Sequence, residues 1–290
     1  MKFPSFGSRA FDVFNAALLG IVALVTAFPV YYVFIVSFTD PVEYVQKGLV
    51  LFPENWSLAS YDYLLSTKAF PKALGVSAFL AVIGTLCSLA VTSSLAYALS
   101  RKRMAGRRMI LLFVLFTILF SPGIIPNYIL IRELGLINNI WSVILAALTN
   151  GWYVILMKGF FESIPETLDE AAAIDGCNDF TAWLAIVLPL SAPALAAFGL
   201  FFAVSYWNQY FNALIYLNDA DKWPIQVLLQ NLLVDASGSG LDVSDVTRQP
   251  PPQETLKMAA VVIAILPIML VYPFLQKHFA KGVMVGSIKG

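Results

Sequence analysis

Charged residues are scarce in this chain. Asp, Glu, Lys and Arg make up 12% of its 290 residues, whereas 59% are hydrophobic and the mean hydropathy is +0.77. So few polar side chains cannot coat a soluble globule of this length. The shortage excludes an ordinary soluble domain and indicates a protein that lives in lipid.

Histidine and cysteine are nearly absent as well. His278 is the only histidine, and Cys87 and Cys177 are the only cysteines. Cys87 lies inside a long apolar run and Cys177 in a polar segment, so we do not expect a disulfide framework. One histidine and two distant cysteines cannot assemble a zinc site within the chain. No G-x-x-x-x-G-K-[ST] nucleotide-binding stretch occurs either. We therefore expect no metal, no cofactor and no catalytic residue in this chain.

Long stretches without any charged residue are the main positive signal. They are Val13–Thr39, Ala73–Ser100, Met109–Ile131, Leu134–Met157, Phe180–Asn218 and Met258–Gln276. A helix needs about 20 apolar residues to cross a bilayer, so five of these stretches fit one span each. Phe180–Asn218 is long enough for a short lead-in helix and a span of roughly 26 residues, with the junction near Pro189 and Pro193.

These stretches predict an all-α membrane protein with six transmembrane helices in a single domain, residues 1–290. The expected spans are approximately 13–38, 73–100, 109–131, 138–158, 191–217 and 257–277. A secretory signal peptide is the alternative interpretation of the first stretch, because Lys2 and Arg9 precede it. Its 27 uncharged residues and the aromatic residues at its far end, Tyr31, Tyr32, Phe34 and Phe38, favour a true span.

The distribution of cations predicts the orientation. "RKRMAGRR", residues 101–108, places five cations in eight residues between the second and third spans. Short loops rich in Lys and Arg resist translocation. With this loop inside, the inner segments hold eleven Lys and Arg and the outer ones seven. We therefore expect both termini to be cytoplasmic.

Two loops on the outer side are long, residues 40–72 and 218–256. The first contains "ENWSLASYDYLL", which predicts a short surface helix, and the second contains "SGSG" and "QPPPQ", which predict turns in water. Within the second span, Gly84, Ser88 and Thr92 recur every four residues. This spacing predicts close packing against another helix.

The segment "PETLDEAAAIDGCNDFTAWLAIVLPLSAP", Pro165–Pro193, lies between the fourth and fifth spans. We expect two short helices within 164–188, the first starting with a capping box of Ser163 and Glu166 and ending at Gly176. Asn178 or Asp179 would cap the second. A slim, alanine-rich helix suits a groove on another protein. The alternative is an amphipathic helix at the membrane surface whose acids are simply hydrated.

"EAAAIDGCNDFTAWLAIVLPLSAP" resembles the EAA signature of binding-protein-dependent ABC importers. "SPGIIPNYILIRELGLINN" and "SYWNQYFNALIYLND" extend the resemblance to the MalG-like permease subunits of carbohydrate importers. The carboxyl-terminal run from "ETLKMAAVV" to "KGVMVGSIKG" is similar to a branch associated with complex oligosaccharides, including aldouronates and alginate.

The resemblance implies a type I ABC importer permease fold with a cytoplasmic coupling helix that docks in a cleft of a separate ATPase. The residues implied in this coupling are Glu170, Ala171, Ala172, Asp175, Gly176, Leu188 and Pro189. Cys177 stands where the family usually has alanine. The implied partners are a second homologous permease, two copies of an ATPase subunit that binds ATP and magnesium, an extracytoplasmic solute-binding protein and membrane lipid. The resemblance also implies that the chain lies in the cytoplasmic (inner) membrane of a bacterium. No nucleic-acid partner is expected.

Polar residues at membrane depth are the candidates for a transport path, because such groups are costly in lipid. They are Tyr206, Trp207, Asn208, Gln209 and Asn212 in the fifth span, and Asn127 and Tyr128 after the third. Amides suit sugar hydroxyls and aromatic rings stack on sugar faces. The alternative is that the aromatics anchor the helix at the interface while the amides bond neighbouring helices.

The predicted function is therefore that of a non-catalytic permease subunit, which moves a carbohydrate by alternating access while a partner hydrolyses ATP. A permease for a non-sugar solute is the first alternative. A secondary transporter is less favoured, because no span contains a charged residue in its interior. A membrane-embedded enzyme is disfavoured by the lack of a nucleophile, acid–base pair or metal set.

Overall fold

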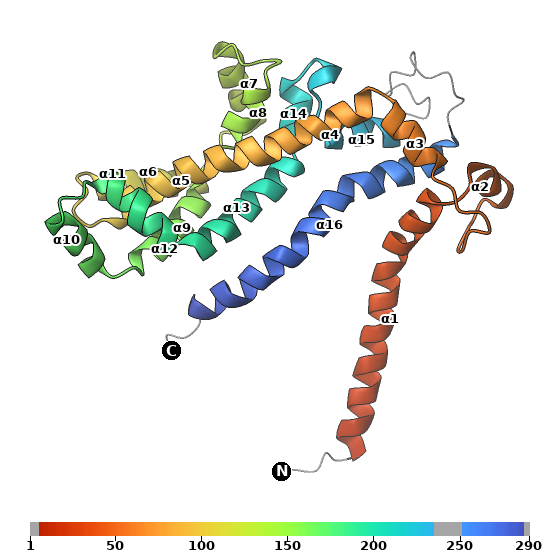
Figure 1. Cartoon of the computed structure of the whole chain (residues 1–290), viewed down its shortest axis with the longest axis horizontal. Helices are drawn as coiled ribbons and strands as arrows, with labels where there is room; N and C mark the ends of the chain where they lie inside the picture. Colours follow the sequence, from red (N-terminus) through yellow and green to blue (C-terminus); the bar gives the residue numbers. More distant parts are fainter. Residues whose placement is uncertain (1–5, 235–250, 287–290) are drawn as a thin grey trace. The chain divides into compact units, whose positions relative to one another are not determined.

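The computed structural model describes residues 6–234 and 251–286. Within these ranges the chain is helical, apart from turns, loops and one isolated bridge between Thr39 and Trp56. The chain divides into two compact units, residues 1–68 with 231–265 and residues 69–230 with 266–290. Figure 1 shows the helices of both units.

The first unit holds α1 (Phe6–Ser37), α2 (Pro41–Lys47), α3 (Ala59–Ser66) and the start of α16 (Gln253–Gly286). The Tyr61 hydroxyl donates to Ser37 Oγ at 2.7 Å, which ties α3 to the end of α1. Ser60 Oγ donates to Thr255 Oγ1 at 3.1 Å, which ties α3 to α16. The 40–72 loop thus contains the surface helix expected from its sequence, and α2 in addition.

Glu43 organises the loop that follows α2. Its carboxylate is buried and accepts hydrogen bonds from the backbone N–H groups of Glu54 and Asn55, at 2.9 and 2.8 Å. Lys47 Nζ lies 3.0 Å from the same carboxylate. These donors, with the two backbone N–H groups contributing most, lower the pKa of Glu43 from 4.5 to about 2.

This shift predicts an acid-sensitive loop. Because the folded pKa is lowered, the stabilisation from Glu43 is fully present above pH 4.5 and is lost as the pH falls toward about 2. Hydrogen exchange at the Glu54 and Asn55 amides should lose protection across this window in the native chain. Glu43→Gln should weaken the protection and remove its pH dependence. Glu54→Gln, at a side chain that is 75% exposed, is the control and should keep the native profile. An unchanged profile in Glu43→Gln would contradict the assignment.

A long helix lies at the centre of the helix contacts in the second unit. Residues Ala69–Ser100 run without a break through α4 (Ala69–Phe79), a π-helical stretch η1 (Leu80–Gly84) and α5 (Thr85–Ser100). α5 packs against α9 (Gly151–Glu162) and α13 (Ala192–Trp207). Leu80, Met157, Phe161, Phe202 and Tyr206 are fully or almost fully buried in this core.

The small residues of the 84–92 pattern face partners in this core, so the packing prediction is confirmed. A Cβ added at Gly84 would lie 2.7 Å from ring carbons of Tyr206. Ser88 Oγ lies 2.9 Å from the Tyr206 hydroxyl, and Thr92 Oγ1 lies 2.8 Å from Thr149 Oγ1.

By length and composition, three helices can cross a membrane: Phe11–Ser37, Ala69–Ser100 and Gln253–Val271. Three bent helix pairs would raise the number to six if each is one span. The first pair is α6 (Arg107–Leu119) with α7 (Ile124–Glu133), the second α8 (Ile140–Ala146) with α9, and the third the α11–α12 segment, Asp179–Leu190, with α13; their bends are 119°, 57° and 86°.

In the structure, each of the expected spans 109–131, 138–158 and 191–217 contains a break between helices. That each of them is one membrane span stays a prediction. α6 ends before Pro122 and Gly123, and Gly123 has a φ of +83° that a non-glycine residue rarely adopts. α8 ends at Ala146, and α9 begins after its N-cap Asn150, whose Oδ1 accepts from the Tyr153 N–H at 2.9 Å. α13 ends at Trp207, three residues before α14 (Phe211–Tyr216).

The loop expected over 218–256 contains a short 3-10 turn, Ala220–Lys222, and α15 (Ile225–Val234). The "SGSG" turn lies outside the described residues, as does the last part of the carboxyl-terminal "KGVMVGSIKG".

Candidate functional site

The predicted coupling segment begins with α10 (Glu166–Ile174). The Cys177 N–H donates to the Ala172 carbonyl at 2.9 Å and the Gly176 N–H to the Ala173 carbonyl at 3.1 Å. These two bonds form a Schellman motif, which requires a left-handed residue at Gly176, where φ is +81°. The prediction that Gly176 ends this helix is confirmed, and Asp175 is its C-cap.

The predicted capping box at the start of α10 is wrong. Ser163 is instead the C-cap of α9, and its hydroxyl donates to the Phe160 carbonyl at 2.6 Å. The N-cap of α10 is Pro165, and no side chain bonds the free N–H groups there. The physical reason is that Pro165, with its fixed φ, starts the new helix two residues after Ser163, too late for the hydroxyl to reach it.

α10 has two different faces. Ala172 is buried, and the Asp169 side chain is 11% exposed. Glu170 and Ala171 are exposed, and Ile174 is 85% exposed. Glu170, Ala171 and Ile174 therefore share the exposed face of α10. Sequence reasoning missed Ile174, although its place three residues after Ala171 could have put it on the same face.

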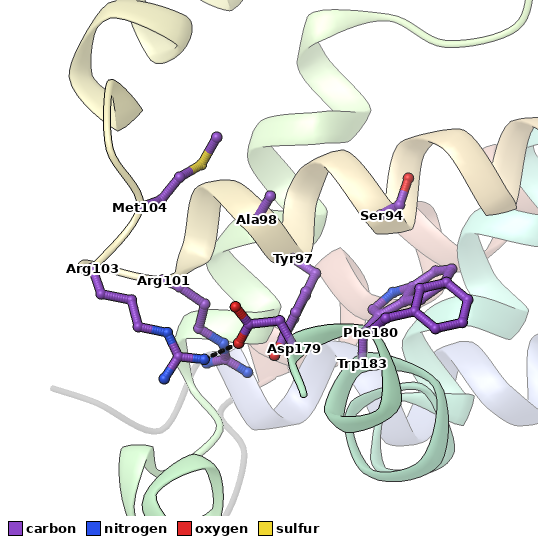
Figure 2. A pocket seen from close by; sticks show the side chains of 9 residues that line it. All are labelled: Ser94, Tyr97, Ala98, Arg101, Arg103, Met104, Asp179, Phe180 and Trp183. Atoms are coloured by element: carbon purple, nitrogen blue, oxygen red, sulfur yellow. Dashed lines mark hydrogen bonds and ion pairs between the residues drawn. The ribbon is translucent and has the colours of Figure 1, made fainter. Parts of the chain in front are cut away.

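The basic loop after α5 binds acids on this segment, which sequence reasoning also missed. Arg101 Nη1 lies 2.9 Å from Asp169 Oδ2 on α10. Arg103 forms an ion pair with Asp179 at the start of α11 (Asp179–Ala182), as Figure 2 shows. Arg107 Nη2 lies 2.6 Å from Glu162 Oε1 at the end of α9. Residues 101–108, whose cations predicted the orientation, thus also link the end of α5 to α9, α10 and α11 by ion pairs.

The second helix of the segment leads into α13. Asn178 caps α11, because its Oδ1 accepts from the Thr181 N–H at 2.8 Å, which confirms one of the two predicted caps. The chain continues through the π-helical stretch η2 (Trp183–Val187) and α12 (Leu188–Leu190) to the 86° bend at Ser191. Pro189 has no N–H to donate back, so the preceding turn widens and the helix stops soon after it. Leu188 is half-buried, and Pro189 is exposed.

At the far end of α13, amide side chains gather where the helix breaks. Asn212 Nδ2 donates to Gln209 Oε1 at 3.2 Å, and Gln226 Nε2 on α15 donates to Asn208 Oδ1 at 3.4 Å. Asn208 is exposed and the other three are half-buried. We call Asn208, Gln209, Asn212 and Gln226 the amide cluster. Gln226 was missed because it lies in a segment expected to be loop.

The aromatic candidates beside the cluster are buried. Tyr206 is completely buried, and its hydroxyl bonds Ser88 Oγ and the Ile144 carbonyl, at 2.9 and 3.0 Å. Trp207 is 7% exposed. The structure therefore gives both residues a packing role within this chain. Their contact with substrate stays a prediction.

The second pair of candidates lies on α7. Asn127 is exposed, and the Tyr128 ring stacks on the Tyr216 ring with centroids 6.4 Å apart. α7 and α14 pack together. In Figure 1 this group lies away from the end of α5 at which α10 and α11 gather. The two sets of candidates, coupling and path, therefore belong to different ends of the second unit.

Among the side chains that the structure describes, no group of three His, Cys, Asp or Glu could hold a metal ion. The His278 side chain lies outside that set. Cys87 and Cys177 are both free thiols.

By length and composition, the described helices fit a membrane protein with three to six spans. The family "Binding-protein-dependent transport system inner membrane component" matches residues 90–285, and the chain belongs to this family. The resemblance drawn from the EAA-like segment is confirmed.

Individual relatives cover nearly the whole chain. It is 46% identical to the polygalacturonan/rhamnogalacturonan transport system permease protein YtcP of Bacillus subtilis, over 98% of this chain and 99% of that protein. It is 42% identical to the protein LplC of the same organism, over 97% and 96%. The crystal structure of a bacterial ABC transporter that imports the acidic polysaccharide alginate contains a chain with a TM-score of 0.87 and 34% identity, covering 96% of this chain and 100% of that one.

Proposed function

We propose that this chain is one permease subunit of an ATP-driven importer for oligosaccharides that contain uronic acids. The observation that carries this proposal is whole-length similarity to two importers of such material, one named for polygalacturonan and rhamnogalacturonan and one for alginate. Polygalacturonan and alginate are both polymers of uronic acids, so the two relatives share a substrate chemistry.

The coupling role of α10 is supported by its geometry. A short helix with a rigid Schellman end and exposed Glu170, Ala171 and Ile174 offers small, acidic and apolar contacts to a cleft on an ATPase. Asp175 is the C-cap of this helix, and Leu188 and Pro189 lie in α12, just before the bend into α13. ATP-driven closure of an ATPase pair would pull this helix and turn the cavity outward, and hydrolysis would reset it.

The substrate path is proposed to pass the amide cluster. Each amide offers two N–H donors and a carbonyl acceptor. The two bonds within the cluster, and a third from Asn208 Nδ2 to the Val204 carbonyl at 2.9 Å, leave most of that capacity unused. Such groups suit sugar hydroxyls and carboxylates alike. Asn127 and Tyr128 on α7 are proposed as a second contact, and Tyr206 and Trp207 as the packed support behind the cluster.

The assembly follows from the same proposal. A second, homologous permease completes the pore, two ATPase subunits bind ATP and magnesium, and a solute-binding protein docks on loops 40–72 and 218–256. The α10 end, with the cations of residues 101–108, is proposed to face the cytoplasm together with both termini. The whole chain sits in the cytoplasmic membrane of a bacterium.

The test is reconstitution of the complex with its binding protein in lipid nanodiscs. Oligogalacturonates or alginate oligosaccharides should stimulate ATP hydrolysis, and neutral maltooligosaccharides of the same length should not. Stimulation by the neutral sugars alone would refute the uronate assignment. Purification without any ATPase chain would refute the importer assignment itself.

The contribution of the amide cluster is measured in the same assay. Asn208→Leu and Gln226→Leu should each raise the concentration of sugar needed for half-maximal stimulation by about threefold to tenfold, the value of one lost hydrogen bond. Asn15→Leu, at an exposed position of α1, is the matched control and should change nothing. Equal effects of all three variants would exclude the cluster from the path.

A further inference from the structure

The end of α5 is joined to α10 by an ion pair that is almost closed to water. The side chains of Arg101 and Asp169 are 9% and 11% exposed, and their charged atoms lie 2.9 Å apart. Arg101 is the C-cap of α5, and Asp169 lies in the middle of α10 on its inward face. The pair therefore links a long helix directly to the proposed coupling helix.

The guanidinium of Arg101 is held in place from a second side. Its Cζ lies 4.6 Å from the centroid of the buried Tyr97 ring, one turn earlier on α5. Figure 2 shows Arg101 and Tyr97 side by side, with Arg103 and Asp179 nearby. A cavity of about 500 Å³ adjoins the group and is lined by these four residues, Phe180 and Trp183, among others.

Stability alone does not account for this contact. Nε and Nη2 of Arg101 are buried and have no hydrogen-bond partner among the described residues. Unpaired buried donors are costly, and a buried ion pair is often no more stabilising than an apolar replacement. Buried pairs are best explained where they fix one arrangement of two elements.

α5, the helix that Arg101 caps, is bonded to other helices of the second unit. Within α5, Ser88 bonds Tyr206 on α13, and Thr92 bonds Thr149 next to α9. A displacement of α10 that moves Arg101 therefore also moves α5. Because α5 is bonded to α13 and to Thr149, just before α9, these helices would be displaced with it.

We propose that Arg101 is a positioning residue of the importer, which transmits the movement of α10 into α5 through its ion pair with Asp169. This inference rests on the proposed function. The neighbouring pair Arg103–Asp179 is 54% and 70% exposed, so it is screened by water and is not needed for transmission.

The experiment uses the full complex in nanodiscs and compares Arg101→Gln, Asp169→Asn and the exchanged pair Arg101→Asp with Asp169→Arg. The measured quantity is the ratio of sugar-stimulated to basal ATP hydrolysis, in preparations that retain the ATPase chains. Each single variant should lower this ratio at least tenfold, and the exchanged pair should recover at least a third of it. Arg103→Gln is the matched control, removes a cation from the same loop, and should stay within twofold of the native ratio.

Arg101→Lys keeps the charge and the fold but shortens the reach of the donor, and it should give an intermediate ratio. If Arg101→Gln yields no complex, the ratio in Arg101→Lys decides the matter. A native ratio in the single variants, or in Arg101→Lys when it alone assembles, would overturn the proposal. A native chain that purifies without ATPase subunits would refute the proposed function instead, so the two failures are distinguishable.

Discussion

Replacing both Glu170 and Gly176 by bulky residues, as Glu170→Trp with Gly176→Val, should uncouple ATP hydrolysis from substrate. Gly176 has a φ of +81° and ends α10 in a Schellman motif. A β-branched residue in this conformation costs about 1–2 kcal/mol or more, so the end of the helix moves. Trp at position 170 then adds bulk to the exposed face that is proposed to enter the ATPase. If docking on the ATPase weakens by the same 1–2 kcal/mol, sugar-stimulated hydrolysis and uptake should both fall by roughly fivefold to thirtyfold.

The measurement is ATP hydrolysis with and without the loaded binding protein, in the reconstituted complex. Cys177→Ala is the matched control, since it changes the next residue to a small one without altering the turn, and it should behave as the native chain. Hydrolysis that stays coupled to substrate in the double variant would count decisively against docking of α10.

Local signals predicted the turn of this segment well. A glycine after an alanine-rich run and an asparagine two residues later specify a helix end and a new cap through bonds to near neighbours. Ser163 misled because its hydroxyl can serve either the end of one helix or the start of the next, and Pro165 decided between them. Both outcomes are set within a few residues, which is the range that a sequence pattern reports.

Contacts between distant residues could not be predicted in this way. The basic loop carried a statistical signal for orientation, but its pairing with Asp169 and Asp179 joins residues that are 68 and 76 positions apart. Charge counts say nothing about which acid lies opposite. Likewise, an uncharged stretch predicts an apolar helix of sufficient length but does not say where it bends, so the breaks before α9 and at Asn208 were not predicted.

In the stretch from Tyr206 to Asn212, the sequence pattern identified the amides but did not predict the packing of Tyr206. Asn208, Gln209 and Asn212 stood out because three amides within five residues are unusual at membrane depth. Tyr206, two residues before Asn208, belonged to the same stretch, yet it points into the core toward Gly84 and Ser88. Helical spacing separates the two faces only when the position of the neighbouring helix is known.

The buried position of Tyr206 gives the second large expected effect, on stability. Tyr206→Ala should destabilise the purified complex by about 3–5 kcal/mol, because it empties a fully packed site, as large-to-small aromatic changes do. Tyr206→Phe should cost about 1–3 kcal/mol, because Ser88 Oγ and the Ile144 carbonyl lose their partner. Gly84→Leu should also destabilise the complex, because it adds a side chain where Gly84 contacts the Tyr206 ring. Its Cβ would lie 2.7 Å from the ring and must displace it.

Thermal unfolding of the complex in detergent measures these costs, with Gly75→Leu as the matched control, since no atom lies within 4 Å of a Cβ added there. The midpoint should fall in the order Tyr206→Ala, then Tyr206→Phe, with Gly75→Leu unchanged. In Tyr206→Phe, the sugar concentration that gives half-maximal stimulation should equal the native value, because the hydroxyl bonds only Ser88 and Ile144 among the described residues. A native midpoint combined with weakened response to sugar would instead place the Tyr206 hydroxyl in the transport path, and the packing role would be refuted.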